Sequence, residues 1–261
     1  MFRKVLICAL LAGCSLAVRA ADTNGDGVET ILLPLAFRSG VTIFGAFGTQ
    51  WRGEVWLRNE SSLPVYLQRA VGCVFNECSA QYPQLFTGRI DDPLQGNADG
   101  GLLLTPSADD ARFLFFSNRM FEVTRHAQPQ GIELPVIREG QFLKSSSLLI
   151  GAPTSNAVRV AIRLYDPRRV SGNAIKIEVL GPDGVILGST TLTTTVPAAS
   201  FGDLLRPGFA AIYDLAGVFP VVHSVPYVHV RVTPLTANAE YWAMASVTDN
   251  DTQQVLLITP Q

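Results

Sequence analysis

The chain has 261 residues, with 48% hydrophobic and 16% charged side chains and a formal charge of −2 at pH 7. This length allows one or two domains with buried cores. The slightly acidic balance, without a cluster of lysines or arginines, argues against nucleic acid as a partner. It argues equally against a polybasic contact with a membrane surface.

The first 20 residues have the pattern of a secretory signal peptide. Arg3 and Lys4 precede an apolar run over residues 5–18, which is too short for a permanent membrane helix of about 20 residues. Small residues three and one places before Ala21 predict cleavage at that point. We therefore expect a secreted or periplasmic protein. Loss of three basic residues with the leader takes the formal charge from −2 to −5.

A lipid anchor is the alternative interpretation of the same leader. Residues 11–14 read LAGC and resemble the lipobox of bacterial lipoproteins, in which the cysteine is acylated and becomes the first residue. Acylation of Cys14 would make this an outer-membrane lipoprotein, and it is the one membrane contact that the sequence suggests. The segment after Cys14 continues the apolar run, whereas the tether behind a lipidated cysteine is usually polar. We therefore favour cleavage before Ala21.

The motif DTNGDG over residues 22–27 resembles the start of an EF-hand-like calcium loop, with oxygen-bearing side chains at places one, three and five and glycine at place six. Place twelve is Leu33, so Glu29 is the nearby acid that could complete the site. One interpretation is a weak extracellular calcium site, with a dissociation constant around 10⁻⁴ to 10⁻³ M. The other is a polar leader over residues 21–30. The candidate calcium ligands are Asp22, Asn24, Asp26 and Glu29.

Residues 51–71 read WRGEVWLRNESSLPVYLQRAV, which is typical of a strand, a short loop and a second strand. A register symmetric about Ser61 sets Trp56 opposite Tyr66, with valines and leucines on the core face. An aromatic face with polar neighbours suits a glycan or protein contact, because flat rings stack with little loss of entropy. The alternative is that this face packs against another sheet or domain. The candidate binding residues are Trp56, Tyr66, Arg58 and Gln68.

Two cysteines remain after the leader, Cys73 and Cys78 in GCVFNECSA. In an oxidising compartment such a close pair predicts a disulfide. A loop of about six residues gives a chain-entropy stabilisation of roughly 2 kcal/mol. Zinc is disfavoured, because two ligands are too few for a structural site and no histidine has a suitable spacing to the pair.

The second half of the chain continues the period-two alternation, and helical periodicity is nearly absent. In residues 158–166, valines, isoleucine and leucine take one face while Arg159, Arg163 and Tyr165 take the other. Turn chemistry at Gly181-Pro182-Asp183-Gly184 predicts a hairpin between the flanking strands. Further strands are expected in YVHVRV, AEYWAMASV and QQVLLIT, with a turn at TDND between the last two.

An approximate internal duplication relates the two halves. ILLPLAFRSG and WRGEVWLRNE in the first half parallel IELPVIREGQ and VRVAIRLYDP in the second, about 100 residues later. We predict an all-β protein of two antiparallel, immunoglobulin-like β-sandwich units, residues 31–126 and residues 132–261. The boundary would lie in HAQPQGIE, at residues 126–133. One large sandwich is the alternative.

The phrases GAFGTQWRGEVWLRN and YWAMASVTDNDTQ resemble segments of uncharacterised secreted bacterial proteins, in which a leading LPxA segment precedes such a tryptophan strand. The resemblance covers the two ends of the mature chain. It implies secretion and an all-β architecture, and it implies no activity or site residues.

Enzyme signatures are weak. GxSxG and HExxH motifs are absent. His223 adjoins Ser224, but neighbours on a strand point to opposite faces, and His229 lies on the polar face of its strand. The acid pairs at residues 91–92 and 109–110 lie in loop-like stretches where solvation or capping is the ordinary role.

We therefore expect a non-enzymatic binding or structural module, secreted or envelope-associated, with an extracellular glycan or protein as partner. Sandwich folds host many activities, so fold alone does not decide. The alternatives are an extracellular hydrolase that acts on glycan with loop carboxylates and a calcium-stabilised adhesin-like protein.

Overall fold

The computed structural model describes residues 25–36, 42–67, 80–90, 100–125, 129–198 and 205–261. Strands account for 51% and helices for 9%, and the several antiparallel sheets do not close into a barrel. The all-β prediction is confirmed. Within the described ranges, no helix is long and apolar enough to cross a membrane.

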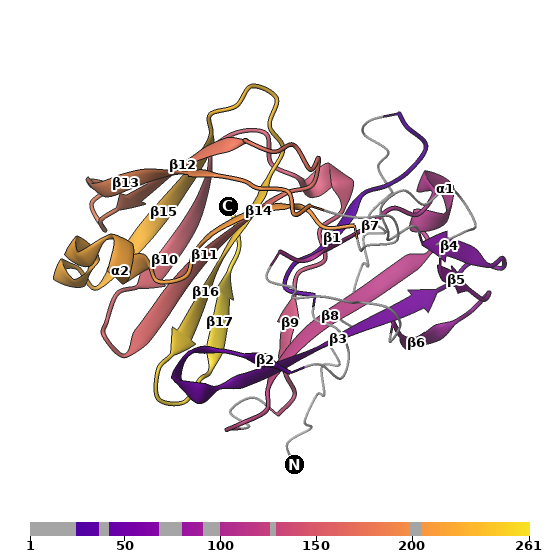
Figure 1. The fold of residues 1–261 in the computed structure, drawn as a ribbon, viewed down its shortest axis with the longest axis horizontal. Coiled ribbons are helices and arrows are strands. Elements are labelled where there is room, and N and C mark those ends of the chain that lie inside the picture. Colours follow the sequence, from indigo (N-terminus) through magenta and orange to yellow (C-terminus); the bar gives the residue numbers. More distant parts are fainter. Residues whose placement is uncertain (1–24, 37–41, 68–79, 91–99, 126–128, 199–204) are drawn as a thin grey trace, which may run out of the picture.

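The elements divide into a first half, β1 to β9, and a second half, η2 to β17, which lie at the right and left of Figure 1. The first half contains β1 (Ile31–Leu33), β2 (Ile43–Phe44), η1 (Ala46–Gly48), β3 (Gln50–Asn59), β4 (Val65–Leu67), β5 (Ala80–Tyr82), β6 (Thr87–Arg89), β7 (Leu102–Leu104), α1 (Ala108–Ala111), β8 (Leu114–Glu122) and β9 (Ile132–Leu134). The second half contains η2 (Glu139–Gln141), β10 (Ser147–Pro153), β11 (Val158–Asp166), β12 (Ala174–Leu180), β13 (Ile186–Thr193), β14 (Gly208–Ile212), α2 (Leu215–Val218), η3 (Pro220–Ser224), β15 (Tyr227–Pro234), β16 (Trp242–Asp249) and β17 (Val255–Ile258).

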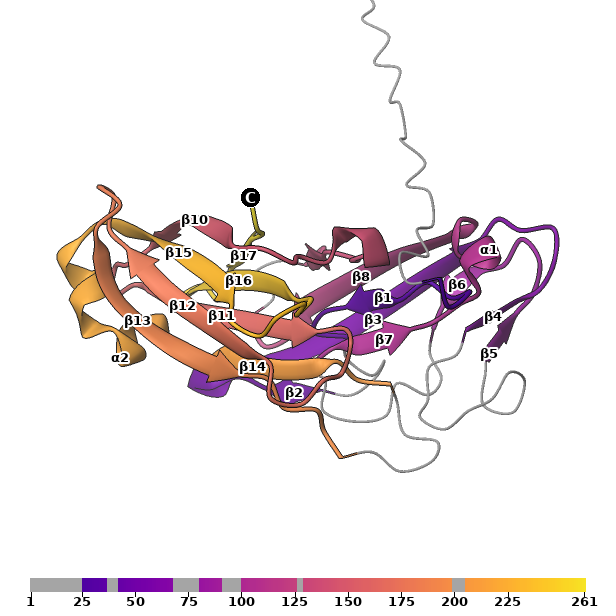
Figure 2. The same ribbon diagram turned by 90° about the horizontal axis from the view of Figure 1, so that it is seen from above.

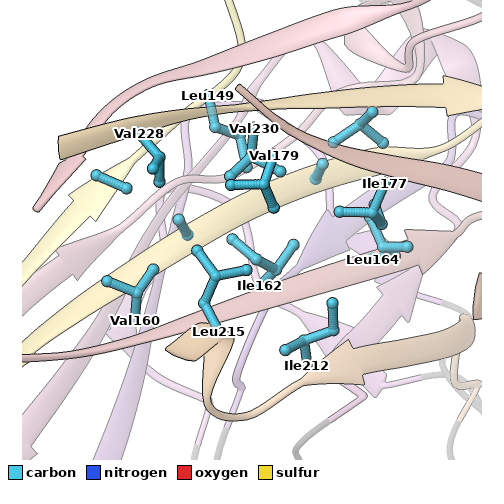
Figure 3. Close-up of a cluster of buried hydrophobic side chains, with 14 of the residues drawn as sticks. Leu149, Val160, Ile162, Leu164, Ile177, Val179, Ile212, Leu215, Val228 and Val230 are labelled. Atoms are coloured by element: carbon cyan, nitrogen blue, oxygen red, sulfur yellow. The ribbon is translucent and has the colours of Figure 1, made fainter. Parts of the chain in front are cut away.

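Two four-stranded sheets form the second half, in the orders β10-β15-β12-β13 and β14-β11-β16-β17. They face each other across one apolar cluster, which Figure 3 shows with side chains from both sheets pointing inward. Val228, Val230 and Val232 of β15 are fully buried, because alternate residues of a strand share one face. The inward alternation expected for 158–166 and YVHVRV is thus confirmed.

Both hairpins expected in this half are present. β12 pairs with β13 across the turn at residues 181–184, and Gly184 has a φ of +82° that suits glycine. β16 pairs with β17. At that turn the Asp249 carboxylate accepts hydrogen bonds from the backbone N–H groups of Asp251 (3.0 Å) and Thr252 (2.7 Å). Local turn chemistry was sufficient to predict these pairings.

The first half is less regular than an immunoglobulin-like sandwich. It has one five-stranded sheet, β2-β3-β8-β9 with β6 beside β3, and two separate two-stranded sheets, β1-β7 and β4-β5. β1 and β7 are buried at every residue, so these short apolar strands act as core filling. The prediction of two immunoglobulin-like sandwiches is not confirmed.

The hairpin predicted between β3 and β4 is wrong. β3 pairs instead with β8 and β6, and β4 pairs with β5. The cause is the buried Asn59 at the end of β3: its amide N–H groups donate to the carbonyls of Leu63 (3.2 Å) and Pro83 (2.8 Å), and its Oδ1 accepts from Ser61 N–H (2.9 Å). These bonds turn the chain out of the sheet, so β6 takes the place beside β3.

The two Leu-Pro segments of the apparent duplication meet in space. Leu32 and Ile137 exchange two backbone hydrogen bonds, of 2.8 and 3.0 Å, and β9 continues the first sheet by pairing with β8. The stretch expected to open a second unit at residue 132 is therefore paired with a strand of the first half. The exact domain boundary stays a prediction.

A separate apolar cluster, which we call the junction core, joins the two halves. It combines side chains of β1, β3, β7, β8 and β9 with Tyr165 of β11, Met244 of β16 and Val255 of β17. Tyr165 and Met244 are fully buried, although they lie on the face of their sheet that is turned away from the second-half core. The outer face of that sheet is therefore an internal surface of the protein.

Truncation of the junction core should destabilise the whole protein. For Met244→Ala we expect a loss of roughly 2 to 5 kcal/mol in the free energy of unfolding, because a fully buried thioether side chain leaves a cavity. Leu256→Ala on the adjacent β17, where the side chain is 62% exposed, is the matched control and should cost less than about 0.5 kcal/mol. Urea titration of both variants measures the difference. Equal losses would contradict the junction core.

Candidate functional site

A cavity of about 390 Å³ lies beside the junction core, between the two halves. In Figures 1 and 2 the β2 end of the first sheet lies beside the sheet that contains β11 and β14. The apolar part of the lining consists of Leu35, Ile43, Phe44, Trp51, Met120, Ala161 and Val255. The polar part consists of Arg159, Arg163, Tyr213, Asp214, Ser246 and Thr248.

The polar wall comes from the outer face of β11 and β16. The antiparallel register places Arg159 opposite Thr248 and Ala161 opposite Ser246, and directly opposite residues share one face. Arg163 follows Ala161 on the same face, because side chains alternate along a strand. The small Ala161 therefore lies between two arginines and leaves open space above the sheet.

The apolar wall is fixed by packing around Trp51. Its indole belongs to the junction core and is only 9% exposed, and its Nε1–H donates to Thr49 Oγ1 at 3.1 Å. Ile43 of β2 is the cross-strand partner of Trp51. Gly45 lies so close to this group that a Cβ there would come within 2.7 Å of the indole nitrogen. The turn before β3 thus requires glycine to hold the ring in place.

The charges of the cavity do not balance. Arg163 donates from Nη1 to Ser246 Oγ at 2.7 Å, and its buried Nε–H has no acceptor in the ranges that the structure describes. Burial lowers the pKa of Arg159, the exposed Asp214 partly opposes this, and the Arg163 charge lowers the pKa further. Among the described lining residues there are thus two guanidinium groups and one carboxylate, so this part of the lining carries a net positive charge.

Beside the hydroxyl groups the described lining residues include no histidine, and Asp214 is their one carboxylate. Of the histidines, His223 contacts the Thr154 carbonyl through Nδ1 at 2.6 Å, and His229 Nδ1 accepts from Gly151 N–H at 3.2 Å; neither lines the cavity. Among the described residues no three histidine, cysteine or acidic side chains gather as a metal site. This arrangement can bind and orient a ligand.

His223 and Ser224 need one correction. They lie in the 3-10 helix η3 and not in the strand that the sequence predicts. Pro220 at its start fixes φ and favours that helix over a strand. The Ser224 hydroxyl donates to the Val221 carbonyl at 2.7 Å, so it is engaged locally and not with the imidazole.

The aromatic face predicted around Trp56 has a different composition from the expected one. Trp56 is 42% exposed on the outer side of β3, and its diagonal neighbour across β8 is Phe115, 51% exposed. Arg58, opposite Phe115, is also exposed. Tyr66 belongs to the separate β4-β5 sheet, where its hydroxyl accepts from Gln81 at 3.1 Å. Gln68 lies outside the described residues.

The four candidate calcium ligands are only partly described. Asp26 is exposed, and its Oδ1 accepts from Val28 N–H at 3.1 Å. Glu29 is fully buried and pairs with Arg138 Nη1 at 2.9 Å, so binding of calcium by its Oε2 would compete with that ion pair. Asp22 and Asn24 fall outside the described ranges, and the calcium site stays a prediction.

Of the other candidates from the sequence, some lie within the described residues and some lie outside them. Asp110 caps the short helix α1 together with Ser107, whose Oγ donates to Asp110 Oδ2 at 2.7 Å. The acid pair at residues 91–92, the leader over residues 1–20 and the cysteines Cys73 and Cys78 lie outside the described residues. The disulfide and the secretion signal stay predictions.

The sequence contained part of the signal for the cavity. Alternation in residues 158–166 placed Arg159 and Arg163 on one face, and the structure places both at the cavity. Which residues would face them was not readable, because β2 and β3 lie more than a hundred residues earlier in the chain. Phe115 was missed, although LFFSNRMFE alternates in the same way.

Comparison of the chain with models of protein families, with curated proteins and with solved structures gave no match.

The buried Glu29–Arg138 pair beside β1 predicts a pH-dependent stability. Burial raises the pKa of Glu29 above its ordinary value of 4.5, while the Arg138 charge and hydrogen bond oppose the rise. In Arg138→Met that opposition is lost, and the pKa rises further. A raised folded-state pKa disfavours the fold as pH increases from the unfolded value to the folded value. The variant should therefore lose roughly 3 to 5 kcal/mol at pH 7 and less at pH 4.

Denaturant melts of Arg138→Met across that pH range measure the effect. The double variant Glu29→Gln/Arg138→Met removes the buried charge and should recover part of the loss at pH 7. A loss in Arg138→Met that does not change with pH would show that the ion pair is not the cause.

Proposed function

We propose that this protein is a non-enzymatic binding protein, secreted or envelope-associated, and that its ligand site is the cavity between the two halves. The supporting observation is the cavity itself. Its volume falls within the range of about 300 to 1,000 Å³ typical of small-molecule sites. Such sites have apolar walls, a few placed polar groups and a position between structural units.

Several features favour a ligand site over a cavity left by incomplete packing between the halves. An interface formed only for stability would bury apolar side chains and exclude unpaired charge, because an unsatisfied buried donor costs about 1 to 3 kcal/mol. Here the same sheet face contributes Met244 to a closed core and Arg163 to an open cavity. The proposed role of the second region is to receive a ligand.

A binding role agrees better with the lining than hydrolysis does. The Ser246 hydroxyl accepts a hydrogen bond from Arg163, and among the described residues no histidine or acid bonds to it. Nucleophilic catalysis requires a base at about 2.6 to 3.2 Å. A glycosidase would need two converging carboxyls, whereas Asp214 is the acid among the described lining residues.

Filling the cavity tests this function. In Ala161→Phe the ring would enter the space between the two arginines, so we expect loss of saturable binding of Nile red or anilinonaphthalene sulfonate, followed by fluorescence. The free energy of unfolding should change by less than about 1 kcal/mol, because existing space is filled. Thr191→Phe, at an exposed position of β13, is the matched control and should bind normally. Probe binding that persists in Ala161→Phe would rule out the cavity.

A second candidate function is a macromolecular contact at the outer face of β3 and β8. The specific observation is the diagonal pair of half-exposed rings, Trp56 and Phe115. Ion pairs border them, Arg89–Glu54 at 3.2 Å and Arg119–Glu133 at 2.7 Å. Aromatic rings with polar neighbours are common anchors at glycan and protein contacts.

For this face we expect that Trp56→Ala/Phe115→Ala changes the free energy of unfolding by less than about 1 kcal/mol, since both rings are about half exposed. Co-sedimentation with insoluble peptidoglycan or chitin should be lost in the same variant. Tyr66→Ala, on the separate β4-β5 sheet, is the control. A decrease of several kcal/mol in the free energy of unfolding would instead show that the two rings are part of the packed core.

A further inference from the structure

We infer that the ligand of the cavity is an organic monoanion with an apolar body, a carboxylic acid in its simplest form, whose acid group binds at Arg163. This inference rests on the proposed binding function and adds the chemical class of the ligand. It depends on three observations: an incompletely used guanidinium, an excess of positive charge and an apolar wall opposite.

The guanidinium of Arg163 has its donors only partly satisfied. Nη1 is held by Ser246 Oγ at 2.7 Å, which fixes the plane of the group, and the buried Nε–H has no acceptor among the described residues. A guanidinium presents parallel N–H groups that match the two oxygens of a carboxylate. A carboxylate would bind the part of the guanidinium that lines the cavity, and it would reach the enclosed Nε–H only after a small shift of the surrounding atoms.

Arg163 differs from three described arginines that pair with buried glutamates. Arg138, Arg168 and Arg231 each have a buried glutamate partner, Glu29 at 2.9 Å, Glu240 at 2.7 Å and Glu178 at 3.4 Å. These arginines hold the fold together by pairing with acids of the chain itself. Arg163 has a neutral hydroxyl partner instead. The missing carboxylate is therefore expected from a ligand.

The second arginine adds charge to the same site. Arg159 lies on the same face of β11, two alternations from Arg163, and each guanidinium experiences the other's repulsion. Asp214 provides one compensating charge, but it is exposed and its Oδ1 accepts from Ala216 N–H at 3.2 Å at the start of α2. A single added negative charge would balance the charges of the described lining residues.

The opposite wall identifies the rest of the ligand. Trp51 and Met120 of the first half are nearly buried, and Ile43 and Phe44 extend this wall toward solvent. An inorganic anion would satisfy the arginines and leave Ile43 and Phe44, the outer part of this wall, against water. An alkyl or aromatic body would cover them, at about 25 cal/mol for each Å² of apolar surface removed from water. The combination favours an amphipathic acid.

Isothermal titration of the wild-type protein with decanoic acid, decanol and decylamine tests the charge selectivity directly. The three probes share one alkyl chain and differ in the head group. We expect decanoic acid to bind at least tenfold more tightly than decanol, and decylamine to bind least, because the arginines repel it. Indole emission from Trp51 should change on binding, since its ring lies at the wall.

Substitution of the arginine identifies the contact. Arg163→Gln should weaken decanoic acid binding roughly ten- to hundredfold, as expected for a charge-assisted hydrogen bond, and leave decanol binding unchanged. Arg163→Lys keeps the charge without the fork and should lose less. Arg112→Gln, at an exposed arginine that ends α1, is the matched control and should not change either affinity.

The outcomes separate the two proposals. Binding of acid, alcohol and amine with equal affinity, all lost in Ala161→Phe, would overturn the inference and leave the binding function standing. Failure of every probe to bind, or binding unaffected by Ala161→Phe, would overturn both. If Arg163→Gln does not fold, the order of the three probes on the wild-type protein still decides, since no preference for the acid overturns the inference.

Discussion

The structure depends on one sheet face, the outer face of β11 and β16, which has both apolar and charged side chains. At one end of this face Tyr165 and Met244 are fully buried against the first half. On the same face Arg163, directly opposite Met244, and Arg159 are only partly buried. Apolar side chains gain from contact with the first half, whereas guanidinium groups lose hydration there. The halves therefore close over the apolar end and leave a cavity over the charged end.

Ion pairs lie near the closed end of this junction. Glu29 pairs with Arg138, and the nearly buried Glu240 pairs with Arg168 and Lys144 at 2.7 and 2.9 Å. Burial alone would raise the pKa of Glu240, but hydrogen bonds and charges from Arg168 and Lys144 lower it. The interaction of Glu240 with Arg168 and Lys144 therefore stabilises the fold above pH values near 4.5, and this effect is lost as Glu240 is protonated at lower pH.

Much of the second half could be predicted because its signals are local. The turn at residues 181–184 and the alternation in β15 predict pairing and burial from neighbours in sequence alone. The β3-β4 hairpin failed for the opposite reason. The pairing of β3 depends on Asn59, whose side-chain amide donates to the carbonyl of Pro83. A contact between residues so far apart in the chain cannot be predicted from local alternation. The expected neighbour of Trp56 was therefore wrong, while its outward direction was right.

The sequence by itself determined which residues share a strand face, since alternation is a property of one strand. It thus placed Arg159 and Arg163 together, and it determined the all-β class. Only the tertiary structure decided that Trp51 and Phe44 face these arginines. Which faces meet depends on the competition of all apolar surfaces for burial, and that competition involves segments throughout the chain. The cavity remains open at Arg163 because desolvation of the guanidinium would cost more free energy than further apolar contact would gain.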